Sequence, residues 1–331
     1  MQPILEVKDL HVSFGAGGDE VHAVRGVSFH VNRGEAVGIV GESGNGKSVT
    51  AQALMRLIPI PSGKIKQGTV TFGDQDLLSL TEKEMESIRG REIGMVFQDP
   101  AASLNPTMTV GRQIAEGLIK HGHLNPGEAR DRTMEMLTAV GIANPEVRFK
   151  QYPHELSGGM KQRVNLAIAA ACNPSLLIAD EPTSALDVTV QAQILQLMKD
   201  LQQRLNISIL LITHDLSVVA ALCDRVLVMY AGKIVETGTK REILENPQHP
   251  YTKALLRSIP RLEQNKDEPL MPIFGNPPDM SRLSAGCEFC GRCEQAMNIC
   301  ERSEPDMFDL SITHQAKCWL HHPLAQARGM A

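Results

Sequence analysis

The stretch from Gly41 to Ser48, Gly-Glu-Ser-Gly-Asn-Gly-Lys-Ser, is the feature that most constrains what this chain folds into. It fits the pattern G-x-x-x-x-G-K-[ST], in which glycines let successive backbone N–H groups point into one concavity that holds a polyphosphate. The apolar residues 36–40 precede it and a helix-like segment follows it, which is the context that the pattern needs. In such a loop Lys47 reaches the β- and γ-phosphates and Ser48 binds Mg²⁺. The sequence therefore predicts a nucleoside triphosphate site.

Composition narrows the class of protein. The chain has 331 residues, 42% of them hydrophobic and 21% charged, which is enough for one large domain and an appendage. A net charge of −5 and an aromatic content of only 4% argue against nucleic-acid binding. No basic segment with an apolar core opens the chain, and no apolar run approaches the roughly 18 residues of a membrane span. We therefore expect a cytoplasmic protein that binds no nucleic acid and contacts a membrane only through partners.

Acidic and imidazole side chains follow two apolar segments that are typical of buried strands. Residues 176–179 lead into Asp180 and Glu181, and residues 207–213 lead into His214. Because ligands bind at the carboxyl ends of parallel strands, we expect these side chains at one edge of a sheet. There Asp180 suits Mg²⁺, Glu181 suits an attacking water and His214 suits a γ-phosphate. The alternative is a pair of solvated acids in a turn, but a triphosphate loop elsewhere in the chain needs such a partner.

A second Gly-containing motif, Ser157-Gly158-Gly159, precedes an apolar helical segment. Ser157 is a favourable N-cap, and the two glycines leave the first N–H groups of the helix uncovered, which makes a second anion site. An ordinary capped helix start explains these residues equally well. Helical spacing without strand signals extends over about residues 100–170, which we interpret as a mainly helical insertion in an α/β domain.

Local signals predict further elements. Thr81 and Glu84 have the spacing of a capping box, and apolar residues recur at helical spacing over residues 188–205. Residues 226–236 are typical of a hairpin. Phe14 precedes a Gly-rich turn, where it is either a core aromatic or a platform that stacks on a flat ring.

Seven cysteines are distributed unevenly. Cys172 and Cys223 lie in apolar helical segments and are expected to be small core residues. The other five crowd into the last fifth of the chain: Cys287, Cys290, Cys293, Cys300 and Cys318. In a reducing compartment such a group indicates metal or cluster binding, and a zinc site with four thiolates fits the short loops. Free thiols in an exposed tail are the bland alternative. A mixed site would use one of His314, His321 and His322.

The order of these motifs resembles that of the ATPase subunits of ABC transporters. The Walker A loop is followed by the Gln98 loop, the signature Leu156–Met160, the Walker B strand with Glu181, the D-loop Ser184–Asp187 and His214. The resemblance covers about residues 1–240. It implies a P-loop NTPase of α/β class with a RecA-like core, an antiparallel β subdomain and a helical subdomain at about 100–170. Residues 1–245 would then form the nucleotide-binding domain, and residues 246–331 a small Cys-rich C-terminal extension.

The resemblance also implies a role for each matching residue. Phe14 would stack on adenine, and Gln98 would sense Mg²⁺ and the attacking water. In that family two such domains pair head to tail, so the signature residues would serve the partner's nucleotide. Met160 stands where the family usually has Gln, which affects side-chain contacts across that interface. The implied ATP contacts are Phe14, Gly41, Ser43, Gly44, Gly46, Lys47, Ser48, Val49, Ser157, Gly158, Gly159 and Asp187. The implied catalytic residues are Lys47, Gln98, Glu181 and His214, and the implied Mg²⁺ ligands are Ser48, Gln98 and Asp180.

Finer features resemble the ATPases of oligopeptide and dipeptide permeases. They are residues 96–100, residues 103–106, the His249-Pro250-Tyr251-Thr252 segment and the Cys-rich tail. This resemblance implies ATP-driven import of di- or oligopeptides, at the cytoplasmic face of the cell membrane. The expected partners are a second ATPase in a heterodimer, two membrane permeases and an external peptide-binding protein. Nickel and glutathione transporters are similar in much of this, and a soluble ABC ATPase without permeases is the alternative of another class.

In the permease family, the pattern Cys-x5-Cys-x6-Cys-x17-Cys resembles a four-iron, four-sulfur site. Cys287, Cys293, Cys300 and Cys318 match it, and Cys290 is a surplus residue that could replace Cys287 or Cys293. The resemblance therefore favours a structural 4Fe–4S cluster over Zn²⁺, beside ATP and Mg²⁺ as cofactors.

Overall fold

The computed structural model describes residues 3–15, 20–184, 186–258 and 273–328. It divides into two compact units. The first contains Met1–Glu6, His30–Ala36 and Thr71–Thr213, and the second contains Val7–Phe29, Val37–Val70 and His214–Ala331. Each unit is described by itself.

Three parallel strands form the centre of the first unit. They are β6 (Ile93–Val96), β7 (Leu176–Asp180) and β8 (Ser208–Thr213), with β7 in the middle. Every residue of β7 and β8 is buried, which is the pattern of parallel strands covered on both faces. The helix α8 (Val188–Leu205) has the bounds that its apolar spacing predicts, and Asp187 caps it by accepting a hydrogen bond from the Val190 N–H at 3.0 Å.

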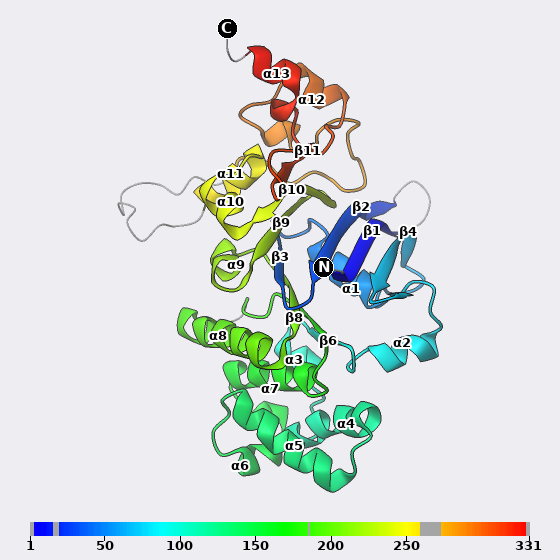
Figure 1. Ribbon diagram of the computed structural model, residues 1–331, viewed down its shortest axis with the longest axis vertical. Coiled ribbons are helices and arrows are strands. Elements are labelled where there is room, and N and C mark those ends of the chain that lie inside the picture. Colours follow the sequence, from blue (N-terminus) through cyan, green and yellow to red (C-terminus); the bar gives the residue numbers. More distant parts are fainter. Residues whose placement is uncertain (1–2, 16–19, 185, 259–272, 329–331) are drawn as a thin grey trace. The chain divides into compact units, whose positions relative to one another are not determined.

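Between residues 100 and 170, the described elements of the first unit are all helical (Figure 1). They are α3 (Pro100–Ser103), α4 (Val110–Gly122), α5 (Pro126–Ala139), α6 (Pro145–Phe149), a 3₁₀ turn (Pro153–Glu155) and α7 (Gly158–Ala170). Gly111 of α4 allows a close approach, because a Cβ there would lie 2.2 Å from the Phe149 ring of α6. The smaller helix α2 (Glu82–Ile88) begins at Thr81 with the predicted capping box, in which Glu84 closes the reciprocal bond.

The second unit contains both parallel and antiparallel strand pairs. The strand β3 (Ala36–Val40) runs parallel to β9 (Arg225–Tyr230), which pairs antiparallel with β10 (Lys233–Thr239). Ala231 and Gly232 turn this hairpin at φ 48° and 79°, as a two-residue turn with positive φ at both positions requires. The predicted hairpin is therefore confirmed.

A second sheet has the order β2-β1-β4-β5. Its strands are β1 (Pro3–Phe14), β2 (Val21–Asn32), β4 (Gly63–Phe72) and β5 (Gln75–Asp76), and β4 and β5 are antiparallel. The strand β1 is continuous over its twelve residues. The helices of the second unit include α1 (Lys47–Leu54), α9 (Leu216–Leu222), α10 (Lys240–Glu245) and α11 (Pro250–Arg257).

The C-terminal segment extends the sheet of the second unit. Its strand β12 (Gln315–Ala316) pairs antiparallel with β10, and β11 (Phe308–Asp309) pairs with β12. The other elements are a 3₁₀ turn (Cys290–Arg292), α12 (Asn298–Arg302), a 3₁₀ turn (Trp319–His321) and α13 (Pro323–Arg328).

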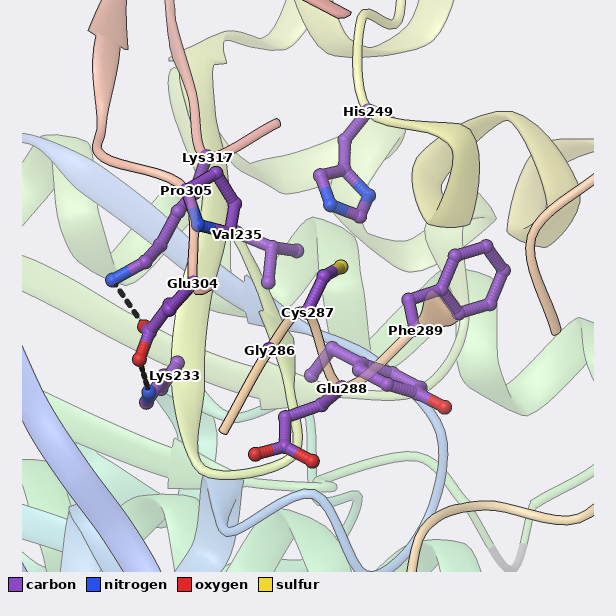
Figure 2. Close-up of a pocket in the computed structure, with 11 residues that line it drawn as sticks. Lys233, Val235, His249, Gly286, Cys287, Glu288, Phe289, Glu304, Pro305 and Lys317 are labelled. Carbon is purple, nitrogen blue, oxygen red and sulfur yellow. Dashed lines mark hydrogen bonds and ion pairs between the residues drawn. The ribbon is translucent and has the colours of Figure 1, made fainter. Parts of the chain in front are cut away.

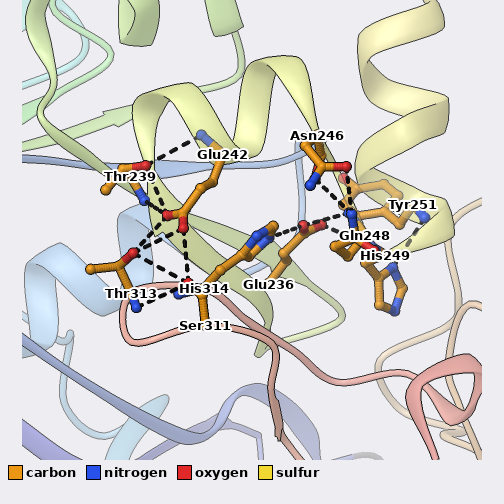
Figure 3. Close-up of polar contacts among 10 residues, drawn as sticks. All are labelled: Glu236, Thr239, Glu242, Asn246, Gln248, His249, Tyr251, Ser311, Thr313 and His314. Atoms are coloured by element: carbon orange, nitrogen blue, oxygen red, sulfur yellow. Dashed lines mark hydrogen bonds and ion pairs between the residues drawn. The ribbon is translucent and has the colours of Figure 1, made fainter.

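Two glutamates attach this segment to β10 and α10 (Figure 3). Glu236, which is fully buried, lies 2.7 Å from Nε2 of His314 and accepts hydrogen bonds from the N–H groups of Gln248 and His249. Glu242 accepts hydrogen bonds from the hydroxyls of Thr239, Ser311 and Thr313. One polar network therefore joins side chains of β10 and α10 to side chains of the C-terminal segment.

Candidate functional site

The loop between β3 and α1 has the geometry of a phosphate-binding loop. Gly46 caps α1 at φ 91°, and a Cβ at this position would lie 2.1 Å from the carbonyl oxygen of Ala23. A Cβ at Gly41 would lie 2.2 Å from the Met229 carbonyl oxygen, so only glycine fits at either end of the loop. Lys47 is 4% exposed, and its Nζ donates to the Glu42 carbonyl at 2.8 Å. Strand, loop and helix thus follow one another as the sequence predicts.

Contacts from distant parts of the second unit fix this loop. Asn45 is 2% exposed, and its Oδ1 accepts from the Ala231 N–H at 3.0 Å. The hydroxyl oxygen of Tyr251, in α11, accepts from the Glu42 N–H at 2.8 Å and from Nδ2 of Asn45 at 3.1 Å. The loop therefore has a defined shape that side chains outside the motif maintain.

In the first unit, two predicted catalytic residues are in contact. Gln98 follows β6, and its Nε2 donates to Oε2 of Glu181, just after β7, at 3.2 Å. Glu181 has φ 46°, and its N–H donates to the Ile212 carbonyl at 2.8 Å. Asp180 ends β7 and is 4% exposed. The structure thus brings an amide and a carboxylate together at the ends of neighbouring parallel strands.

The Ser157-Gly158-Gly159 motif opens α7, as expected. Ser157 is the N-cap and accepts a hydrogen bond from the Met160 N–H at 3.4 Å. A Cβ at Gly158 would meet no atom within 4 Å, whereas a Cβ at Gly159 would lie 2.8 Å from Val190 of α8. Gly158 therefore leaves an open approach to the helix N-terminus, and Gly159 allows α7 and α8 to pack.

The remaining predicted site residues lie in both units. Phe14 ends β1 in the second unit, where its ring edge leaves no room for a Cβ at Gly63. His214 directly follows β8 and is the first residue of the last segment of the second unit. Asp187 of the predicted D-loop caps α8, and Ala185 of that loop lies outside the described residues.

The cysteines of the C-terminal segment interact with one another. Burial, together with the nearby thiols of Cys300, Cys318 and Cys293, raises the pKa of Cys287 to about 12. Burial likewise raises the pKa of Cys318 to about 11, and the thiols of Cys293 and Cys300 raise it further. Cys287 lines a pocket beside His249 and Phe289 (Figure 2). Thiols of the predicted quartet thus contribute to the raised pKa values of Cys287 and Cys318, after burial as the main cause.

The arrangement of these cysteines bears on whether they form a metal site. In the described residues, no three His, Cys, Asp or Glu side chains are placed to hold a metal ion together. The donor chemistry of four thiols fits a soft metal or cluster, but the side chains are not arranged as a ready ligand set. Outside this segment, Cys223 is fully buried as expected, while Cys172 is only partly buried.

Comparison with known proteins identifies the family. The ABC transporter family matches residues 24–184, and the family "Oligopeptide/dipeptide transporter, C-terminal region" matches residues 235–300. The oligopeptide transport ATP-binding protein OppD of Bacillus subtilis (strain 168) is 58% identical over 320 residues, covering 97% of this chain and 89% of that protein. The chain belongs to the oligopeptide/dipeptide family of ABC transporter ATP-binding subunits.

Further relatives agree with this assignment. The dipeptide transport ATP-binding protein DppD of the same organism is 52% identical, covering 98% of this chain and 97% of that protein. A dimeric ATP-binding cassette solved in a post-hydrolysis state with ADP and Pi aligns with a TM-score of 0.64 and 29% identity, over 72% of this chain and 99% of that chain. The expected ABC fold is confirmed, and this ABC subunit is an ATPase that acts on ATP with Mg²⁺. In the part of the chain that the structure describes, no helix has the length and apolarity to cross a membrane.

Four residues around the phosphate loop of this ABC subunit were not predicted as site residues. Glu42 and Asn45 occupy unrestricted positions of the motif, and Tyr251 and Arg292 lie more than 200 residues away. The His-Pro-Tyr-Thr segment marks Tyr251 as a family feature without giving its role. Nothing in the local sequence marks Arg292, because its contact depends on the folded second unit.

Proposed function

We propose that the chain is the ATP-hydrolysing subunit that powers import of di- or oligopeptides through a membrane permease complex. The observation that carries this proposal is the match of residues 235–300 to the C-terminal region of oligopeptide/dipeptide transporters, joined to an intact phosphate loop. Two relatives more than 50% identical to this chain are an oligopeptide and a dipeptide transport ATP-binding protein, both from Bacillus subtilis.

The site residues are assigned as follows. Backbone N–H groups of the phosphate loop and Nζ of Lys47 bind the β- and γ-phosphates, while Phe14 stacks on adenine. Ser48, Gln98 and Asp180 would hold Mg²⁺, which would supply positive charge to the β- and γ-phosphates. The loop residues Ser43, Gly44 and Val49 complete the phosphate cradle.

Glu181 orients and activates the attacking water. As the water oxygen bonds to the γ-phosphorus, its proton passes to the Glu181 carboxylate, and the bond from the γ-phosphorus to the bridging oxygen breaks, so that ADP leaves with the electron pair. His214 donates to the γ-phosphate and stabilises its developing charge. The contact between Gln98 and Glu181 at 3.2 Å supports these roles, because it orients the carboxylate.

The signature residues serve a nucleotide held by another chain. Ser157, Gly158 and Gly159 present the open N-terminus of α7 to the γ-phosphate of that nucleotide, and Asp187 contacts the same interface. The partner is a second ATPase, and the pair works at the cytoplasmic face with two permeases and an extracytoplasmic peptide-binding protein. ATP closes the pair and hydrolysis reopens it, which drives the permeases through alternating access.

We further propose that the cysteine quartet, although its side chains are not arranged as a ready ligand set here, would hold a structural 4Fe–4S cluster, with Zn²⁺ as the alternative. Cys287, Cys293, Cys300 and Cys318 are the ligands, and Cys290 is the substitute. When bound, the cluster supplies a cross-link between parts of the segment that have little regular structure. Protein purified without air should be brown and contain iron and acid-labile sulfide, and Cys290→Ser should keep both while Cys300→Ser loses them. Colourless protein with stoichiometric zinc would instead establish the zinc site.

Uptake measurements test the transported substrate. A host strain that lacks this gene should lose uptake of labelled dipeptides and tetrapeptides, and the wild-type gene should restore it. Lys47→Ala should fail to restore it, because the phosphates lose their cation. Uptake of nickel and of glutathione should be unaffected. A selective loss of nickel or glutathione uptake would assign the subunit to that transporter instead.

A further inference from the structure

The phosphate loop contains an acidic residue whose charge the C-terminal segment neutralises. The carboxylate of Glu42 forms a bidentate ion pair with Arg292, whose Nη1 lies 2.7 Å from Oε2 and whose Nη2 lies 2.9 Å from Oε1. The side chain of Arg292 is 6% exposed and that of Glu42 is 25% exposed. This fork geometry gives the strong, charge-assisted type of hydrogen bond.

Arg292 is itself held firmly. Its guanidinium carbon lies 5.9 Å from the ring centroid of Tyr230 and 6.0 Å from that of Phe289. Its Nε donates to the Phe274 carbonyl at 3.0 Å. Its Nη1 and Nη2 also donate to the Tyr230 hydroxyl and the Ile273 carbonyl, each at 3.3 Å. Burial and these contacts hold the guanidinium with both Nη atoms facing Glu42. Arg292 lies between Cys290 and Cys293 in the chain, so the cysteine-bearing segment determines its position.

An unpaired carboxylate in this loop would oppose ATP binding. ATP brings several negative charges to the backbone N–H groups of the loop, and a nearby like charge repels them. In addition, a loop that is already in its bound shape loses less conformational entropy when the ligand binds. Arg292 cancels the charge of Glu42, and Tyr251 fixes the backbone of the same residue through a hydrogen bond to its N–H at 2.8 Å.

We propose that Arg292 is a positioning residue of the ATP site, through which the cysteine-bearing C-terminal segment sets the affinity of the phosphate loop for nucleotide. Tyr251 is the second residue that fixes the phosphate loop, through its hydrogen bond with the Glu42 N–H. The proposal rests on the assignment of this loop as the ATP site. It gives the segment a function beyond its attachment to β10.

A double-mutant cycle tests whether Arg292 acts on nucleotide affinity through Glu42. The variants are Glu42→Gln, Arg292→Gln and the two together, each titrated with a fluorescent ATP analogue and Mg²⁺. Arg292→Gln should raise the Kd about tenfold, on the order of 1.4 kcal/mol, because it leaves Glu42 unpaired. In the Glu42→Gln background the same change should raise the Kd less than about twofold, since no carboxylate remains to repel the nucleotide. KM for ATP should rise with the Kd while kcat stays near the wild-type value.

Two matched variants separate positioning from folding. Glu304→Gln removes the ion pairs of Glu304 with Lys233 and Lys317, which also hold the C-terminal segment but do not touch the loop. It should leave the Kd unchanged. Arg292→Lys keeps the charge and loses the fork, so its Kd should fall between those of wild type and Arg292→Gln, with the thermal midpoint near that of wild type.

Other outcomes would reject the proposal. An equal loss of affinity in both backgrounds would mean that Arg292 does not act through Glu42. Arg292 would have only a structural role if Arg292→Lys folds and has the Kd of wild type while Arg292→Gln does not fold. Wild-type protein that binds no nucleotide would instead reject the assigned ATP site itself.

Discussion

Glu181 has a backbone conformation that glutamate rarely adopts, with φ 46°. Left-handed conformations of non-glycine residues persist only where the surroundings determine them. Here the N–H of Glu181 donates to the Ile212 carbonyl, and its own carbonyl accepts from the Ser184 N–H and hydroxyl. These bonds orient the carboxylate toward Gln98. The strain and the contact are therefore parts of one arrangement.

Glu181→Gln should separate binding from hydrolysis. The amide keeps the size and the backbone contacts, but it cannot accept a proton from water, and general bases typically contribute about 10²-fold to 10⁴-fold. We expect ATP affinity close to that of wild type and a fall in phosphate release of at least about a hundredfold. Glu146→Gln, at an exposed position of α6, is the control and should change neither quantity. Undiminished turnover in Glu181→Gln would remove this residue from catalysis.

At the scale of elements, short-range signals were sufficient where the deciding contacts are local. The capping box of α2 joins residues three apart, and the bounds of α8 follow from its apolar spacing alone. The contact of Arg292 with Glu42 spans 250 positions in the chain, and no propensity encodes such a distance. The same holds for β11 and β12, which are two residues long and exist because the edge of β10 accepts them.

The helix α11 depends on a neutral histidine. His249 is its N-cap, and Nδ1 accepts from the Tyr251 N–H at 3.0 Å. Burial lowers the pKa of His249 to about 3, from an ordinary value near 6.5. Between these values the unfolded chain binds a proton that the folded chain does not, so the free energy of unfolding falls as the pH drops below about 6.5.

We therefore expect the stability of the protein to fall on the order of 2 kcal/mol between pH 7 and pH 5 from this residue alone. Urea unfolding at several pH values measures it. His249→Asn keeps an N-cap acceptor but does not titrate, so its unfolding midpoint should depend less on pH in this window. Parallel pH curves for the two proteins would contradict the assignment.

Glu236 anchors the C-terminal segment to the sheet. It is fully buried, and its two oxygens accept from two backbone N–H groups and contact His314. Glu236→Gln turns an NH₂ group toward these donors, and breaking such a buried pair costs about 3 to 5 kcal/mol. We expect lower thermal stability and faster proteolysis near residues 246–250. Glu245→Gln removes only an exposed pair with Arg241 and should have little effect. Equal proteolysis of both variants would exclude an anchoring role.

At the scale of the whole molecule, the sequence motifs predict the chemistry of the site better than they predict how the subunits assemble. Each motif is contiguous and carries its own strand end or helix start, so the phosphate loop and the carboxylates of β7 are identified without tertiary information. The domain boundary at residue 245 stays a prediction, since the segments of the two units alternate along the chain. The metal of the cysteine group also stays a prediction, because four thiols suit more than one metal.

The assembly itself leads to the last prediction. The N-terminus of α7 is open at Gly158, where an added Cβ would meet no atom within 4 Å. If this surface serves a nucleotide on another chain, the isolated subunit lacks half of its own site. It should bind ATP with Mg²⁺ and yet hydrolyse it slowly, and turnover should rise when the partner ATPase is added.

Gly158→Asp gives the sharpest version of this test. A carboxylate at this helix start would oppose the γ-phosphate of the partner's nucleotide, while the variant's own phosphate loop keeps every contact. Nucleotide binding by the isolated variant should equal that of wild type, and stimulation by the partner should be lost. Sedimentation establishes that the isolated sample is monomeric, and phosphate release is then measured with and without partner. Full-rate hydrolysis by a strictly monomeric sample would show that one chain contains the whole site.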